Sequence, residues 1–256
     1  MFELPLFQVE NFVFVLVRVS SIFVAAPVLS SRALPVQLKV GLVLFLTFAM
    51  LPSARVVPSD FPGSLPLLVM GLGSEILLGV AIGLMARLML ATVQIMGQMV
   101  GFQMGFGIAM VIDPATMEQQ GVIASFLSMF ATLIFLVTNG HHLFFRALAE
   151  SFRVLAPFGF SASQGFVDTL ARTFQNVFVV AFRMGAPIFA ILLFVYTGLG
   201  IIARTVPQIN IFVVGFPLTI SIGLVALGLV LPYLVVIVRG IFGQLGHDIV
   251  LLLRTM

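Results

Sequence analysis

Long uncharged stretches dominate the pattern of hydrophobic and polar positions along the chain. The clearest are residues 119–145, 184–203 and 205–238. A helix that crosses a bilayer needs about 20 mostly apolar residues, so these stretches predict membrane-spanning helices. The third stretch is too long for one crossing and contains several prolines. It therefore predicts a helical hairpin, with its turn near residues 210–217 or near residues 228–232.

Further apolar stretches each carry a defect. They are residues 12–29, 40–51, 65–89 and 90–112. Arg18 lies inside the first, Pro52 ends the second early, and Glu75 interrupts the third, while glycines crowd the fourth. Irregular backbone at membrane depth is tolerated only where protein buries it or where it lines a water-filled cavity. We therefore expect broken helices that pack against other subunits.

Composition restricts the class of protein. Of the 256 residues, 61% are hydrophobic and 8% are charged, whereas soluble domains have about 45–50% and about 25%. Such a chain cannot cover its outside with polar side chains, so we expect an all-α, membrane-associated protein covered by lipid or by other apolar subunits. The absence of cysteine excludes disulfides, thiol nucleophiles and cysteine-ligated metals. The basic residues form no run that could follow a phosphate backbone, so a nucleic-acid partner is not expected.

Glycine and methionine are concentrated between residues 97 and 120. Gly97, Gly101 and Gly105 recur at every fourth position, which on a helix gives one small-residue stripe that permits close helix approach. Gly107 and the Asp113–Pro114 pair predict the end of this helix. One interpretation is a packing interface that ends in a turn. The other is a flexible, methionine-lined loop that closes a pore, since unbranched thioether side chains adapt to irregular surfaces.

Several charged residues lie inside or at the edge of the apolar stretches, where an unpaired charge costs a few kcal/mol or more. They are Arg18, Glu75, Arg87, Arg183 and Arg204. An ion or proton path is one interpretation, but arginine does not release its proton, which favours structural ion pairing with partner subunits. The predicted subunit contacts are Arg18, Lys39, Glu75, Arg204, Pro207, Gln208 and Asn210. The last four are expected to form a turn between two uncharged segments.

No motif supports catalysis or cofactor binding. Residues 139–142, Asn-Gly-His-His, predict a turn at the membrane edge. Adjacent histidines point to different sides of a helix or strand and make a poor metal pair, so no metal site is expected. The chain contains no H-E-x-x-H, G-x-S-x-G or Walker motif. We therefore expect a protein that is not an enzyme and that holds no cofactor.

Four stretches, read together, resemble a known family. They are residues 18–42, 105–123, 139–152 and 203–218. In this order they are similar to the FliR family of the bacterial flagellar type III export apparatus, and the similarity covers essentially the whole chain. The Asn-Gly-His-His segment resembles the flagellar branch more than the virulence-injectisome branch, which is the second interpretation.

The resemblance implies a fold, partners and a location. Members of the family join FliP and FliQ in a conical, helical, hetero-oligomeric export gate, with FlhB and FlhA nearby, in the bacterial inner membrane at the flagellar basal body. Residues 1–173 would be FliP-like and residues 174–256 would form a FliQ-like helical hairpin. Unfolded export substrates would pass through the gate. Membrane lipid would contact the outside of the gate. Proton-motive force and a cytosolic ATPase complex would drive export.

The resemblance also implies a pore plug in the loop at about residues 101–114. The candidate plug residues are Gly101, Met104, Gly105, Phe106, Gly107, Met110, Asp113 and Pro114. Other classes of function have less support. A small-solute transporter would show an inverted repeat, and an intramembrane enzyme would need a constellation of acid, base or nucleophile; we find neither in the sequence. A purely structural scaffold is left open.

Overall fold

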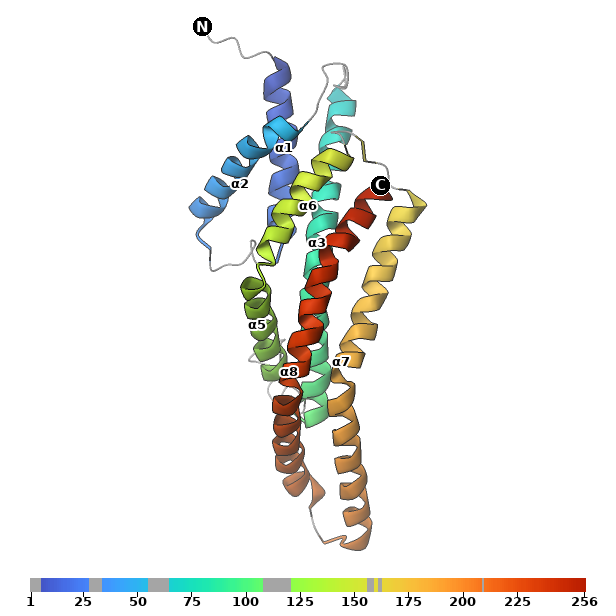
Figure 1. Cartoon of the computed structure of the whole chain (residues 1–256). Helices are drawn as coiled ribbons and strands as arrows, with labels where there is room; N and C mark the ends of the chain where they lie inside the picture. Colours follow the sequence, from blue (N-terminus) through green and yellow to red (C-terminus); the bar gives the residue numbers. More distant parts are fainter. Residues whose placement is uncertain are drawn as a thin grey trace. The chain divides into compact units, whose positions relative to one another are not determined.

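The structure, a computed structural model, consists of helices and their connections within the residues that it describes. These are residues 6–27, 34–54, 65–107, 121–155, 159–160, 163–208 and 210–256. The helices are α1 (Leu6–Ala25), α2 (Val36–Met50), the short 3-10 helix η1 (Leu51–Ser53), α3 (Leu65–Met104), α5 (Val122–Val137), α6 (His141–Val154), α7 (Gln164–Thr205) and α8 (Ile211–Arg254) (Figure 1). Within these ranges there is no strand.

The helices are long and apolar enough for a membrane. Four segments of the described chain meet this test, Val36–Ser53, Leu65–Met104, Gln164–Thr205 and Ile211–Arg254, and α5 with α6 makes a fifth if the two count as one span. The prediction of an all-α, membrane-associated protein is confirmed. Helices α3, α7 and α8 have 40, 42 and 44 residues. At about 1.5 Å per residue each is about 60 Å or longer, roughly twice the hydrocarbon thickness of a bilayer.

Two expectations about helix ends need correction. Residues 65–89 and 90–112 do not form separate segments, because α3 runs without a break from Leu65 to Met104. Glu75 does not interrupt this helix, since its carboxylate is paired inside the protein, as described below. By contrast, the turn predicted at Asn139 is confirmed: α5 and α6 are separated there, and Asn139 has a positive φ of 55°.

Helix α7 ends at Thr205 and α8 begins at Ile211, so the hairpin turn lies at the edge of the first predicted position. The second position, near residues 228–232, is wrong because it lies inside α8. Pro217 and Pro232 are also inside α8, and Pro187 is inside α7. Proline removes one backbone donor, and membrane helices tolerate this where neighbouring groups satisfy the freed carbonyl. Proline was therefore a poor signal for helix ends in this chain.

Two compact units share the three long helices. Unit 1 comprises Met1–Met89, Asn139–Phe174 and Phe242–Met256, and unit 2 comprises Leu90–Thr138 and Gln175–Ile241. Helices α3, α7 and α8 therefore contribute one part to each unit. Helix α7 is continuous through residues 173 and 174. The division of the chain into a FliP-like and a FliQ-like region at that point stays a prediction.

In unit 1, helices α1 and α3 pack closely. Phe14, Val15 and Val19 of α1 are at most 2% exposed. On α3, a Cβ added to Gly79 would overlap the hydroxyl of Ser21, and one added to Gly83 would overlap Ala25. These two glycines, four residues apart, form the small-residue contact that lets two helix backbones approach.

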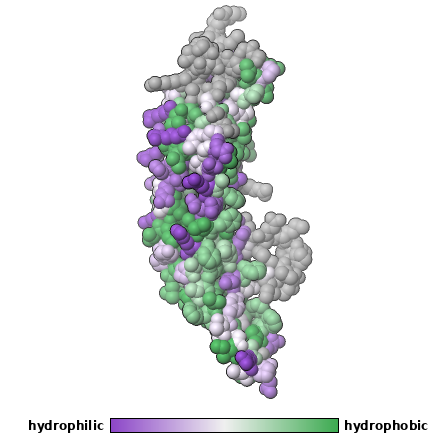
Figure 2. Space-filling view, turned by 90° about the vertical axis from the view of Figure 1, so that its right-hand side faces the viewer, coloured by the Kyte–Doolittle hydropathy of each residue, from purple (hydrophilic) through white to green (hydrophobic). Residues whose placement is uncertain are grey.

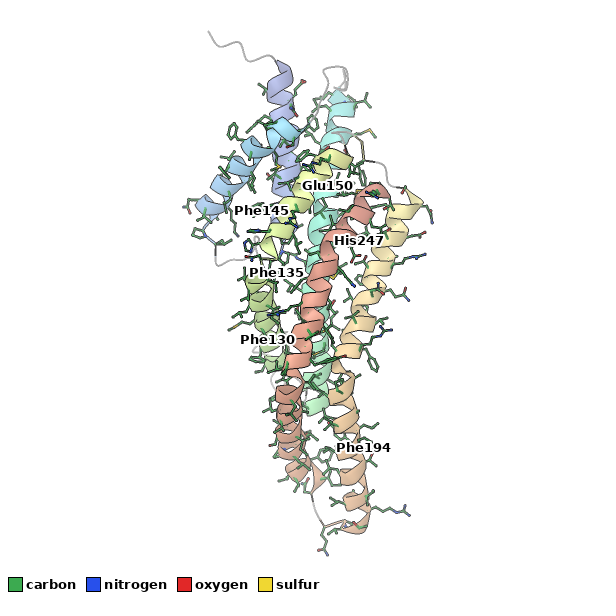
Figure 3. All side chains as sticks on the ribbon, in the orientation of Figure 1. Phe130, Phe135, Phe145, Glu150, Phe194 and His247 are labelled. Carbon is green, nitrogen blue, oxygen red and sulfur yellow. The ribbon has the colours of Figure 1, made fainter. Side chains whose placement is uncertain are left out.

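Unit 2 has a core from four helices but a largely apolar outside. Met96, Leu127, Ile188 and Ala226 are at most 2% exposed and come from α3, α5, α7 and α8. Phe194 of α7, in contrast, is 76% exposed and points away from the neighbouring helices (Figure 3). Figure 2 shows that much of the lower half of the face drawn there is hydrophobic, with hydrophilic residues at its lowest end. Lipid or partner proteins must cover such a surface.

The α1–α3 packing gives a first prediction. Gly83→Ala should lower the free energy of unfolding by about 1–3 kcal/mol, because the new methyl group overlaps the backbone of Ala25 and the helices must separate. The measurement is the unfolding temperature of the detergent-purified protein. Gly73→Ala is the matched control, since a Cβ at this α3 position meets nothing within 4 Å. Equal unfolding temperatures for the two variants would contradict the close approach.

Candidate functional site

The candidate site begins at the end of α3 in unit 2, where the sequence predicts a pore plug. The structure describes the first half of this segment, up to Gly107. Met110, Asp113 and Pro114 lie outside the described residues. The part of the site that can be described is therefore the end of α3, which would anchor a plug.

Helix α3 ends in a glycine-based C-terminal motif. Gly105 has a positive φ of 101°. Its N–H donates to the carbonyl of Phe102 at 3.1 Å, and the N–H of Phe106 donates to the carbonyl of Gly101 at 3.1 Å. This pair of bonds is the Schellman motif, which commonly has glycine at the left-handed position. The helix thus ends at Gly105, before the predicted break at Gly107.

The last two carbonyls of α3 accept hydrogen bonds from other helices of unit 2. The hydroxyl of Tyr196 on α7 donates to the carbonyl of Gln103. The hydroxyl of Thr219 on α8 donates to the carbonyl of Met104 at 2.9 Å. Carbonyls at a helix C-terminus have no partner within the helix and need one from elsewhere. Side chains of α7 and α8 therefore fix the point where α3 ends.

The glycine stripe is a packing surface. A Cβ at Gly97 would lie 2.7 Å from Cα of Ala124, and one at Gly101 would lie 3.4 Å from Cβ of Ile123. Both partners belong to α5. The interpretation of the stripe as a close helix contact is thus supported for these two positions. Gly105 faces a different helix, because its Cβ would lie 2.9 Å from Cδ1 of Phe216 on α8.

The side chains around this helix end divide into two groups. Met104 is fully buried, and a Cβ at Gly223 of α8 would lie 2.6 Å from its Cγ. In this structure Met104, one of the candidate plug residues, therefore packs in the core of unit 2, and its part in a plug stays a prediction. Phe102 is 75% exposed and Phe106 is partly exposed. These aromatic rings are the apolar surface available near the predicted plug.

A cavity of about 460 Å³ adjoins the end of α3 within unit 2. Gly105 and Gly107 line it together with Phe102, Tyr196 and Phe216. Its lining contains no charged side chain. Among the described residues, the hydroxyl groups that line it are those of Tyr196 and Thr219, and both donate to carbonyls of α3. Such a space can accommodate apolar side chains that move.

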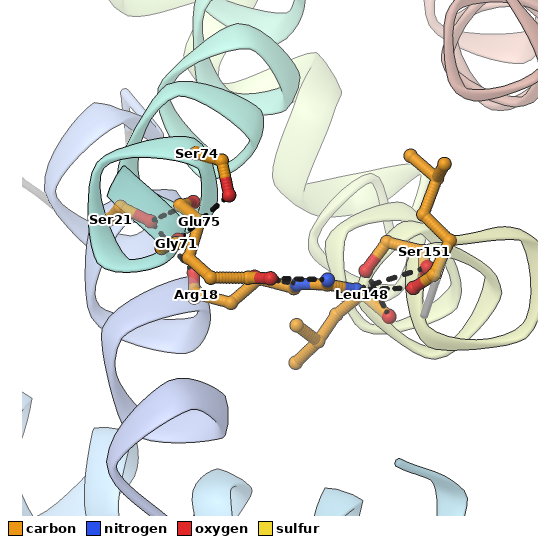
Figure 4. Close-up of polar contacts among 8 residues, drawn as sticks. Arg18, Ser21, Gly71, Ser74, Glu75, Leu148 and Ser151 are labelled. Atoms are coloured by element: carbon orange, nitrogen blue, oxygen red, sulfur yellow. Dashed lines mark hydrogen bonds and ion pairs between the residues drawn. The ribbon is translucent and has the colours of Figure 1, made fainter. Parts of the chain in front are cut away.

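In unit 1, the predicted contact residues Arg18 and Glu75 pair with each other. They are 0% and 2% exposed. The guanidinium of Arg18 donates to both carboxylate oxygens of Glu75, from Nε to Oε2 and from Nη2 to Oε1 at 2.9 Å (Figure 4). The prediction that these two residues contact partner subunits is wrong for their side chains. The structure gives each a partner inside the chain, and burial leaves neither accessible.

The same arginine also caps α6. Its Nη1 donates to the carbonyls of Ser151 at 3.1 Å and Leu155 at 3.0 Å. Its guanidinium carbon lies 4.4 Å from the centroid of the Phe152 ring, a cation–π contact. On the other side, the hydroxyl of Ser21 donates to the carbonyl of Arg18 at 2.9 Å. We call Arg18, Glu75, Ser151, Phe152 and Leu155 the arginine cluster. It joins α1, α3 and the end of α6.

The other predicted contact residues remain accessible. Arg204, Pro207, Gln208 and Asn210 are exposed at the turn between α7 and α8, so the predicted turn is confirmed. The Oδ1 of Asn210 accepts hydrogen bonds from the N–H groups of Phe212 at 3.1 Å and Val213 at 3.4 Å, so Asn210 caps α8. Lys39 on α2 is partly exposed and lines a groove between α1 and α2. That these residues contact partner subunits stays a prediction.

Sequence reasoning missed several residues on which these sites depend. They are Gly79, Gly83, Ser151, Tyr196, Gly223 and Thr219. The spacing of Gly79 and Gly83 was a usable signal for helix approach. Tyr196 and Thr219 are hydroxyl-bearing residues within apolar helices, but the sequence does not show which carbonyls they bind.

Comparison with known proteins identifies the family. Residues 9–245 match the family described as bacterial export proteins, family 1. The chain belongs to this family. It is 37% identical over 235 residues to the flagellar biosynthetic protein FliR of Bacillus subtilis, covering 90% of each chain. It is 32% identical over 232 residues to FliR of Escherichia coli, covering 90% of this chain and 87% of the relative. FliR of Aquifex aeolicus is 31% identical over 223 residues, with 86% and 84% covered. The resemblance to the FliR family is thus confirmed.

The arginine cluster gives a prediction for this FliR-family chain. Glu75→Leu should lower the free energy of unfolding by about 3–5 kcal/mol, because it leaves the buried Arg18 without its counter-charge. Adding Arg18→Met should restore part of that loss, since the double variant buries no charge. The measurement is the unfolding temperature of the purified protein in detergent.

An exposed ion pair serves as the control. Nη1 of Arg153 lies 3.7 Å from Oε2 of Glu150, and these side chains are 75% and 35% exposed. Glu150→Leu should change the free energy of unfolding by about 1 kcal/mol or less, as is usual for surface pairs. The interpretation fails if the double variant is no more stable than Glu75→Leu alone.

The end of α3 gives a further prediction. Gly105→Ala should destabilise the protein by about 1–3 kcal/mol, because alanine is strained at a φ of 101°. The Cβ would also press on Phe216. Adding Phe216→Leu should relieve only the contact, so most of the loss should remain. Gly198→Ala on α7, where a Cβ meets nothing within 4 Å, is the control and should be neutral or stabilising. Calorimetry in detergent distinguishes these outcomes, and an unchanged Gly105→Ala protein would contradict the motif.

Proposed function

We propose that this chain is a non-enzymatic subunit of the bacterial flagellar type III protein export gate. In this role it helps to form and close the pore through which unfolded flagellar proteins are exported, and it supports assembly of the flagellum. Family membership and relatives named as flagellar biosynthetic proteins support this proposal. The same relatives favour the flagellar role over the equivalent role in a virulence injectisome.

The observation that carries the proposal is the fixed end of α3. The Schellman motif and the hydroxyls of Tyr196 and Thr219 hold the helix up to Gly105. The predicted plug follows directly. A closure for a pore of protein width must yield to a passing chain and then reseal, so it needs a firm anchor beside a displaceable apolar segment. Gating by hydrophobic constrictions is an established mechanism in channels.

The expected partners are FliP and FliQ in a common complex, with FlhB and FlhA nearby, in the bacterial inner membrane at the flagellar basal body. The exposed apolar rings of unit 2, such as Phe102 and Phe194, support a surface that partners or lipid cover. The long helices support it too, because a helix of roughly 60 Å must extend beyond a bilayer. Residues 1–173 are assigned to the FliP-like part and residues 174–256 to the FliQ-like hairpin.

The proposed subunit contacts are the accessible polar residues identified above. They are Lys39, Arg204, Pro207, Gln208 and Asn210. The last four are exposed at the turn between α7 and α8, where a partner could satisfy their polar groups. A small-solute transporter remains the less favoured alternative.

Deletion of residues 106–110 tests the closure. Cells that express the complete complex with this deletion should leak small ions and grow poorly, because the apolar constriction is lost while the anchor of α3 is retained. The measurements are ion efflux and the recovery of the assembled complex. Phe106→Ser provides the same test with a smaller change, and Phe194→Ser is its matched control, since it removes an exposed ring from α7.

The two readouts separate the possible results. Leakage with normal assembly supports the plug. If the deletion complex assembles in full and stays as ion-tight as the parent, residues 101–114 do not close the pore. The glycine stripe then has only its packing role. Leakage of the Phe194→Ser control would also count against a specific closure at this segment.

A further inference from the structure

A charged groove in unit 1 lies apart from the predicted plug and from the arginine cluster. It has a volume of about 540 Å³ and runs between α6 and the last part of α8. Arg146, Glu150 and Arg153 line it on α6, and Gly243, Gly246 and Val250 line it on α8. Figure 3 labels Glu150 on α6 and His247 on α8, which mark these two helices.

The α6 wall belongs to an amphipathic helix. Phe144, Leu148 and Phe152 are at most 4% exposed and hold one face of α6 in the core. Arg146 and Arg153 are exposed. They are seven residues apart, about two helical turns, so their side chains lie on the same face.

The charges of the groove do not cancel. Glu150 forms an exposed pair with Arg153, at 3.7 Å, and such pairs are weak. Arg146 forms no ion pair or hydrogen bond with any part of the chain that the structure describes. Two guanidinium groups and one carboxylate give the groove a net charge of +1 (2 − 1). A bound anion would give Arg146 the partner that it lacks.

The α8 wall leaves room for a ligand. A Cβ at Gly243 would meet nothing within 4 Å, and one at Gly246 would meet only Cδ2 of Leu143 at 3.6 Å. Leu143 and Val250 add apolar surface to the lining. The groove therefore combines the unpaired guanidinium of Arg146 with an apolar wall. Of its two helices, α8 is apolar enough to cross a membrane.

We propose that this groove binds an anionic phospholipid. Its phosphate lies against Arg146 and Arg153, and an acyl chain follows Leu143 and Val250. Guanidinium groups bind phosphate through paired N–H donors, and basic pockets between membrane helices bind anionic headgroups. Glu150 stays paired with Arg153, so Arg146 is the main phosphate ligand and the net positive charge selects an anionic headgroup over a zwitterionic one.

Native mass spectrometry of the full chain, purified with its co-purifying subunits, tests the proposal. The protein is titrated with phosphatidylglycerol and with phosphatidylethanolamine that carries the same acyl chains. Phosphatidylglycerol should bind at a saturable site and more tightly. Arg146→Gln and Arg153→Gln should each weaken its binding roughly fivefold. Gly243→Leu, which fills the groove at an open position, should abolish binding. Arg172→Gln is the matched control, an exposed arginine of α7 outside the groove, and should have no effect.

The Glu150→Gln variant distinguishes further between binding of the two headgroups. Removing this carboxylate should strengthen phosphatidylglycerol binding, whereas it would weaken binding of a lipid whose ammonium group Glu150 holds. The proposal is overturned if both lipids bind equally, if the arginine variants bind like the parent, or if neither lipid binds because a partner protein covers the groove. Full displacement of the lipid by excess inorganic phosphate would show a free-anion site and also overturn it. Ion efflux is independent of these readouts, so failure here leaves the proposed gate untouched.

Discussion

The buried pair of Arg18 and Glu75 is the interaction on which the arrangement of unit 1 depends. Removing either charge from water costs several kcal/mol, so neither side chain can be buried without the other. Both carboxylate oxygens of Glu75 accept from Arg18, and Nη1 of the guanidinium donates to two carbonyls at the end of α6. These bonds tie α1, α3 and the end of α6 to one another. Apolar packing alone would permit helices to slide or rotate, because similar side chains can fill the same space. The charged pair therefore favours this arrangement of the three helices, because breaking it would leave a buried charge without a partner.

In unit 2, hydroxyl groups instead of charged groups bind the backbone at a helix end. The carbonyls at the end of α3 accept from Tyr196 and Thr219, much as carbonyls at the end of α6 accept from Arg18. In both units, a side chain from one helix thus satisfies the C-terminal carbonyls of another. A chain with 8% charged residues has few polar side chains for this purpose. Arg18 and Thr219 are buried polar side chains that lie beside the end of another helix, where the backbone has unpaired acceptors.

Features that depend on local composition were predictable from the sequence, and contacts between distant residues were not. Long apolar stretches, the turn at Asn139 and the polar turn before α8 were predictable, because they depend on local composition. The pairing of Arg18 with Glu75 was not, since the residues are 57 positions apart and a pattern gives the cost of a buried charge but not its partner. Arg18 and Glu75 were assigned to subunit contacts because residues 12–29 and 65–89 were treated as separate spans. Pro217 and Pro232 were misleading for a related reason: whether proline ends a helix depends on the surroundings of the freed carbonyl, which local sequence does not contain.

In the proposed gate, the two interpretations of the glycine-rich segment apply to consecutive parts of it. Gly97 and Gly101 are committed to α5, and Met104 is committed to the core beside Gly223. None of these can move without opening the packing of unit 2. Gly105 ends this fixed part, because its left-handed backbone closes the Schellman motif. In the proposed gate, a passing chain would therefore displace residues after Gly105 while α3 keeps its place. A closure hinged further back, within the stripe, would have to separate α3 from α5 and lose buried contacts at each passage. The position of the cap makes the lower-energy motion the one that spares the helix.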